Sequence, residues 1–108
     1  MRESFPDEAG RAAYYAGFHS AQAAIFERAG KVLKTHKGVH TEFNRLVRDI
    51  PEPTPNLWGF LRRAYVMKAF ADYGTGPRLA VTDENAREAI DTAQMFVDAI
   101  AAVVARTD

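Results

Sequence analysis

The sequence lacks cysteine, net charge and long apolar runs, and each absence excludes a class of protein. Without cysteine among the 108 residues, disulfides, thiolate catalysis and zinc ribbons are excluded. The 14 basic and 14 acidic residues cancel, so nucleic acid would have to bind through a local patch and not through a broad basic field. No apolar run approaches the ~20 residues of a membrane span. We therefore expect no membrane association.

The first ten residues contain no apolar segment of the kind found in signal peptides. Glu3, Asp7 and Glu8 make this stretch acidic instead. Together with the absence of cysteine, this composition predicts a cytoplasmic protein. The chain is 47% hydrophobic and 26% charged, which is enough apolar material for one core. Its length predicts a single domain over residues 1–108.

Four stretches repeat apolar residues at helical spacing, and none alternates as a strand would. The spacing predicts helices over residues 6–28, 36–49 and 54–73, with a fourth that begins after Thr82. Thr35 and Thr82 are candidate N-caps, and Gly30 is a candidate C-cap. Thr54 is the expected N-cap of the third helix, and Pro55 is its expected first helical residue. Short loops between amphipathic helices predict an all-α, antiparallel four-helix bundle.

The apolar stripes predict which face of each helix is buried. The longest stripe belongs to the fourth helix and has Phe96 at its centre. In the first helix the predicted buried stripe contains Ala12, Tyr15, Phe18, Gln22, Ile25, Phe26 and Ala29. The small residues opposite would let another helix approach closely; they are Ala13, Ala16, Gly17, Ala21 and Ala24.

Three histidines are the most versatile side chains. His36 and His40 are four residues apart and share a helix face, so they could bind a metal. They lack an acidic residue in an HExxH arrangement and an evident third ligand, which favours solvent-facing or capping roles. His19 is expected to pack or hydrogen-bond within the first helix.

A second group of interest is basic: Arg62, Arg63, Lys68 and Arg78. One interpretation is a small phosphate-binding patch. The other is a solvated helix face, in which Lys68 pairs with Asp72 four residues on. Gly74 and Gly76 are not followed by the lysine and hydroxyl residue of a phosphate loop.

Four ordered segments resemble the HEPN family (higher eukaryote and prokaryote nucleotide-binding). Residues 14–23 read YYAGFHSAQA, similar to the aromatic and alanine-rich first helix of that family. Residues 34–39 read KTHKGV and resemble its THxGV element. Residues 64–74 read AYVMKAFADYG, similar to AYxxRxxADYG, and residues 89–97 read AIDTAQMFV, similar to AIxxAxxFV. The resemblance covers about residues 7–100.

The resemblance implies a helical bundle that forms a homodimer. Many HEPN proteins are metal-independent ribonucleases that need no cofactor and are toxins encoded beside a minimal nucleotidyltransferase antitoxin. Their site combines an arginine and a histidine spaced RxxxxH or slightly wider. Such an enzyme uses the 2′-hydroxyl of RNA as its nucleophile, the histidine for proton transfer and the arginine for the phosphate.

This sequence departs from the family at that site. Lys68 occupies the place of the arginine, and Asp72 and Tyr73 occupy the place of the histidine. Lysine holds a phosphate as a point charge, without a bidentate fork. The first hypothesis is therefore an RNase toxin with a variant catalytic site at Lys68, Asp72 and Tyr73, aided in RNA binding by Arg62 and Arg63. The alternative is a noncatalytic module that binds a nucleotidyltransferase or a nucleotide.

Overall fold

The computed structural model describes the backbone of residues 5–73 and 82–105 and the side chains of residues 8–69 and 82–105. The described part contains four α-helices: α1 (Phe5–Ala29), α2 (His36–Val47), α3 (Phe60–Tyr73) and α4 (Asp83–Ala105). A short 3₁₀ turn, η1 (Leu57–Gly59), precedes α3. The predicted all-α class is confirmed. No helix in the described residues is long and apolar enough to cross a membrane.

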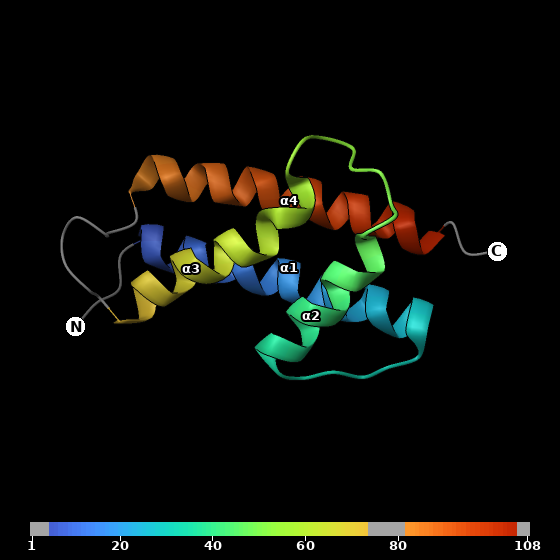
Figure 1. The fold of residues 1–108 in the computed structure, drawn as a ribbon. Helices are drawn as coiled ribbons and strands as arrows, with labels where there is room; N and C mark the ends of the chain where they lie inside the picture. Colours follow the sequence, from blue (N-terminus) through green and yellow to red (C-terminus); the bar gives the residue numbers. More distant parts are fainter. Residues whose placement is uncertain (1–4, 74–81, 106–108) are drawn as a thin grey trace.

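The two long helices, α1 and α4, lie side by side and run in the same direction (Figure 1). Helix α3 runs the opposite way and also packs on α1. The short helix α2 lies against the C-terminal half of α1, reached by a loop at that end of the bundle (Figure 1). Helix α1 is therefore the central element, contacted by all three others.

Three of the predicted helix ends are confirmed by their hydrogen bonds. The hydroxyl of Thr35 accepts from the backbone N–H of Gly38 at 2.9 Å, and that of Thr82 accepts from Asn85 at 3.0 Å. Both bonds satisfy N–H groups that have no partner inside the helix. Gly30 ends α1 with a left-handed φ of 70°, and its N–H donates to the carbonyl of Phe26.

Two predicted boundaries are wrong. Helix α2 ends at Val47 and not at Asp49, because Ile50 donates to Val47 three residues back and tightens the chain into a turn. Helix α3 begins at Phe60 and not at Pro55, the residue after the predicted cap Thr54. Asn56 has a left-handed φ of 65°, which separates Pro55 from the helix, and η1 follows it.

The predicted buried face of α1 is also partly wrong. Phe18 and Ile25 are buried, but Ala12, Tyr15 and Phe26 are exposed, Phe26 by 54%. The small residues opposite are buried instead, except Ala16; they are Ala13, Gly17, Ala21 and Ala24. Their expected use is confirmed at Gly17, where an added Cβ would lie 2.9 Å from Phe60 of α3. Close helix approach thus occurs within the chain.

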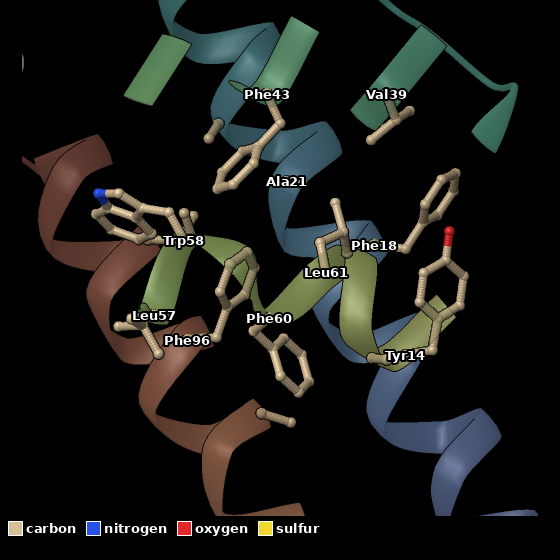
Figure 2. Close-up of a cluster of buried hydrophobic side chains, with 14 of the residues drawn as sticks. Tyr14, Phe18, Ala21, Val39, Phe43, Leu57, Trp58, Phe60, Leu61 and Phe96 are labelled. Carbon is tan, nitrogen blue, oxygen red and sulfur yellow. The ribbon is translucent and has the colours of Figure 1, made fainter. Parts of the chain in front are cut away.

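Aromatic side chains fill the centre of the core. The Phe96 ring is fully buried, with the rings of Phe43 and Phe60 each 5.3 Å away between centroids. Trp58 meets Phe96 edge to face at 6.2 Å, and its indole N–H donates to the carbonyl of Ile50 at 3.0 Å. In Figure 2 this cluster runs from Trp58 at one side to Phe18 and Tyr14 at the other. Phe96 is confirmed as core.

Candidate functional site

On the side of the core where Figure 2 labels Tyr14 and Phe18, the Tyr14 hydroxyl is the polar group among the labelled side chains. It lies 2.7 Å from Nδ1 of His36 and 3.0 Å from Nε2 of His40. The Thr35 cap starts α2 at His36, and the four-residue spacing puts both imidazoles on one face, toward α1. A phenol has one proton and two lone pairs, so it donates to one imidazole and accepts from the other.

Burial keeps this hydrogen-bonded group neutral. Desolvation, with the nearby Tyr65 and Tyr15, raises the pKa of Tyr14 well above its ordinary value. Burial first, and the neighbouring His36 second, lower the pKa of His40 below 6.5. Protonation of both imidazoles would leave the phenol proton without an acceptor and place two positive charges side by side. The arrangement therefore favours at least one neutral histidine.

Aromatic rings from α1 and α3 enclose the hydrogen bonds. Tyr65 of α3 lies 5.1 Å from His36, 5.3 Å from Tyr14 and 5.5 Å from His40, between ring centroids. Phe18 lies 5.1 Å from His36. We call Tyr14, Tyr15, Phe18, His36, His40 and Tyr65 the aromatic–histidine cluster. Tyr15 and Tyr65 are each 37% exposed, so the cluster extends from the core to the surface.

Lys68 joins the cluster at its surface edge. Its ammonium nitrogen lies 5.6 Å from the centre of the Tyr15 ring, a cation–π distance. The ring of Tyr15 is also 6.5 Å from that of His36. The Tyr15 ring thus lies near both the predicted phosphate-binding lysine of α3 and a histidine of α2. The local sequence around Lys68 contains no histidine.

His19 lies next to the cluster on α1. Its ring is stacked against Tyr15 at 6.1 Å with an interplanar angle of 28°. Nδ1 of His19 is 2.7 Å from Oε1 of Gln22, and Nε2 of Gln22 donates to the carbonyl of Leu33 at 2.9 Å. The expectation that His19 hydrogen-bonds within the first helix is confirmed.

The two predicted RNA-binding arginines point to different parts of the surface. Arg62 is exposed and lies three residues before Tyr65 on α3. Arg63 donates to the carbonyl of Asn56 at 3.0 Å and lines a cleft of about 400 Å³ between α3 and α4. The structure therefore places Arg63 at the α3–α4 cleft and leaves Arg62 on the exposed surface of α3.

The remaining predicted site residues fall at the end of α3 or beyond it. Asp72 and Tyr73 belong to the last turn of α3, and their side chains lie outside the described residues, as does Arg78. Their assignment to the site, and the pairing of Lys68 with Asp72, stay predictions.

The geometry of His36 and His40 bears on the metal-binding alternative. Their Nδ1 and Nε2 atoms face one phenol oxygen at hydrogen-bond distances, which leaves no room for an ion between them. Within the described residues, no group of three or more histidines or acids could hold a metal. The predicted solvent-facing or capping role of the pair is wrong: both imidazoles are partly buried, and both hydrogen-bond to Tyr14.

Sequence reasoning missed Tyr14 and Tyr65 as site residues. Both stand in the segments that resemble the HEPN family, and Tyr14 lies next to the predicted buried stripe of the first helix. A buried hydroxyl needs a hydrogen-bond partner. His19 and Gln22 are nearer to Tyr14 along the chain than His36 and His40 are, so the sequence alone does not identify the partner.

Comparison with known proteins gives one match. The model of the HEPN domain family matches residues 1–103, which is almost the whole chain. No curated protein and no solved structure matches. The matched range includes the aromatic–histidine cluster, Lys68 and every residue of the predicted site.

Proposed function

Because the chain belongs to the HEPN domain family, we propose that it is the RNase toxin of a prokaryotic toxin–antitoxin pair. The family supports a nucleotide-binding or RNase-type activity. The observation that carries the proposal is the position of Lys68, whose ammonium lies over Tyr15 while the ring of His36 approaches the same tyrosine. A cation for a phosphate and an imidazole for proton transfer thus lie near one aromatic ring.

The proposed reaction is cleavage of RNA by its own 2′-hydroxyl. The 2′-oxygen attacks the adjacent phosphorus, the bond from phosphorus to the 5′-oxygen breaks, and a cyclic phosphate forms. Lys68 would stabilise the negative charge that develops on the phosphate oxygens. Asp72 and Tyr73, which follow Lys68 on α3, stay proposed proton-handling groups. Arg62, exposed on α3, would contact the RNA backbone.

We also propose the partners of the toxin. Two copies of the chain would associate, as HEPN domains often do, and a minimal nucleotidyltransferase would act as the antitoxin in the cytoplasm. The neighbouring gene tests this part of the proposal. A small nucleotidyltransferase encoded there, and co-purification of the two products after co-expression, is the expected result. If the native genome encodes no such neighbour and no such protein co-purifies, the proposed pairing is overturned.

Cleavage of a fluorescently labelled single-stranded RNA oligonucleotide tests the nuclease. We expect the wild-type chain to cut RNA and to slow growth on expression. Lys68→Ala should abolish both, because the phosphate loses its cation, and Asp72→Asn tests proton transfer with little change in shape. Lys37→Ala, an exposed lysine on α2, is the matched control. A wild-type chain that neither cuts RNA nor slows growth would overturn the proposal.

One observation favours a second candidate, a noncatalytic module that binds a nucleotidyltransferase or a nucleotide. Both cluster histidines already use a ring nitrogen on Tyr14, as residues with a structural role do. Titration calorimetry with ATP, and with RNA carrying 2′-O-methyl groups, distinguishes the candidates. Binding without cleavage of unmodified RNA would support the module, and cleavage by the wild type would reject it.

A further inference from the structure

The side-chain amide of Gln22 has only one orientation that fits its surroundings. Its Nε2 lies 2.9 Å from the carbonyl oxygen of Leu33, in the loop between α1 and α2. A carbonyl only accepts hydrogen bonds, so the amino group of Gln22 must face it. The amide oxygen then faces the other neighbour, Nδ1 of His19, at 2.7 Å.

This orientation determines the tautomer of His19. An amide oxygen also only accepts, so Nδ1 of His19 must carry the hydrogen. The neutral ring therefore has its basic lone pair on Nε2. Leu33, Gln22 and His19 form a directed chain of hydrogen bonds that orients the imidazole and leaves Nε2 as its basic atom. Residues that act as general bases are commonly held in this way by a partner on the other nitrogen.

The other two histidines are held differently. His36 and His40 share the Tyr14 hydroxyl, and each is partly buried. Burial and His36 also lower the pKa of His40. His19 is exposed, so its Nε2 can meet a substrate without rearrangement of the core. Among the three histidines, all of them in the described part of the chain, His19 is the best placed for proton transfer with a bound molecule.

His19 and the proposed phosphate-binding lysine contact the same ring. The ring of His19 lies 6.1 Å from that of Tyr15, and the Lys68 ammonium is 5.6 Å from the centre of the Tyr15 ring. Tyr15 is therefore the titratable group that both residues share. A nucleotide bound at Tyr15 would contact both the Lys68 cation and the oriented imidazole of His19.

We infer that His19 is the general base of the reaction, an inference that rests on the proposed RNase function. Nε2 takes the proton of the 2′-hydroxyl as the bond from O2′ to phosphorus forms. The bond from phosphorus to O5′ breaks, and O5′ takes a proton from solvent water or from the proposed proton-handling groups of α3 and leaves as a hydroxyl. The products are a 2′,3′-cyclic phosphate and a 5′-hydroxyl end. The imidazolium of His19 returns its proton to solvent.

His19→Gln tests the catalytic role in an RNA cleavage assay. We expect kcat to fall by roughly 100-fold or more, the usual contribution of a general base. Affinity for the same oligonucleotide with 2′-O-methyl groups should change little, because the substitution leaves Lys68 and Tyr15 in place. Glu27→Gln, another exposed position on α1, is the control and should keep the wild-type rate.

Gln22→Glu tests the positioning chain by a different readout. The carboxylate still accepts from Nδ1 but stabilises the imidazolium, so the acidic limb of the pH–rate profile should move to higher pH. Nitrogen NMR of His19 should show hydrogen on Nδ1 in the wild type. Unchanged cleavage in His19→Gln, or hydrogen on Nε2, would overturn the inference and leave the RNase proposal intact. A wild-type chain that cuts no RNA would overturn both.

Discussion

Tyr14 places a hydroxyl where α1 meets α2 and α3, in otherwise apolar surroundings. Its side chain has no solvent exposure, so water cannot satisfy the hydroxyl. The two imidazoles of α2 meet that need and at the same time fix the position of α2 against α1. Tyr14 therefore links the packing of the bundle to the candidate site, because Tyr15 and Tyr65 pack against its ring.

We expect Tyr14→Phe to lower the free energy of unfolding by about 1–3 kcal/mol, the usual cost of leaving polar partners unsatisfied. Urea denaturation measures it. Tyr15→Phe is the matched control, since this neighbouring tyrosine is 37% exposed and should change stability little. Equal effects in the two variants would show that the hydrogen bonds to His36 and His40 contribute nothing.

Stability should also depend on pH through His40. Its pKa in the folded chain lies below the ordinary 6.5, so below pH 6.5 the unfolded chain binds a proton that the folded chain resists. The free energy of unfolding should therefore decrease as pH falls below 6.5 and be independent of this group above it. Urea midpoints between pH 5 and 8 measure the slope. An unchanged slope in His40→Gln would contradict the assignment.

The sequence predicts part of this residue-scale picture. Helical spacing places His36 and His40 on one face, and Thr35 predicts where α2 begins. The shared partner is 22 and 26 residues earlier in the chain, and its contact depends on how α1 and α2 are aligned. Periodicity within one helix contains no information on that alignment. The Lys68 contact with Tyr15, from α3 to α1, was unpredictable for the same reason.

At the scale of the element, α1 differs from an ordinary amphipathic helix. Three other helices contact it, so its buried arc is wide and includes small residues as well as Phe18 and Ile25. A pattern that ranks residues by size selects Tyr15 and Phe26 for the core, whereas close helix approach selects alanine and glycine. This is why the predicted face was partly wrong although the helix itself was predicted within a residue at each end.

Gly17→Ala should destabilise the protein, whereas Gly10→Ala should stabilise it. At Gly17 the new Cβ would lie 2.9 Å from the ring of Phe60. Overpacking of this kind costs about 1–3 kcal/mol of stability. This cost outweighs the gain in helix propensity, which is about 1 kcal/mol. At Gly10 the neighbour is the flexible side chain of Met67 at 3.3 Å, which can move. Thermal melting should show a lower Tm for Gly17→Ala only. A rise in both variants would contradict close packing of α1 on α3.

Phe96→Ala should lower the free energy of unfolding by about 3–5 kcal/mol, because a fully buried aromatic ring leaves a cavity. Phe26→Ala removes the same side chain from a position that is 54% exposed and is the control. We expect less than ~1 kcal/mol there. Denaturant unfolding compares the two, and similar losses would mean that α4 does not supply the centre of the core.

The fold of the whole molecule followed from the sequence because its signals agree. Helical periodicity, threonine caps at residues 35 and 82, and the glycine after α1 all indicate the same elements. The end of α2 and the start of α3 were the wrong boundaries, and the start of α3 was further from its prediction. Three prolines at residues 51–55 predict a break, but Pro55 can equally begin a helix or stand in a turn. The left-handed φ of Asn56 places Pro55 in a turn before the helix.

We expect the chain to form a homodimer through α1 and α3. Their outer faces carry the exposed side chains of Tyr15, Tyr65 and Val66. Light scattering at micromolar concentration should give about twice the chain mass of 12.0 kDa. Val66→Glu should produce monomers, and Ile90→Glu, exposed on α4, should not. A wild-type monomer at every concentration would contradict the interface.

Trp58 also provides the molecule with an optical reporter. It is the single tryptophan, and it is almost fully buried beside Phe43 and Phe96. The emission of an indole responds to the polarity around it, so its fluorescence reports opening of this side of the core without a label. Three of the four tyrosines lie together, Tyr15 and Tyr65 each 5.3 Å from Tyr14, which stands at the opposite side of the cluster in Figure 2. Coincident changes in tryptophan emission and tyrosine absorbance would show that the bundle melts as one cooperative unit.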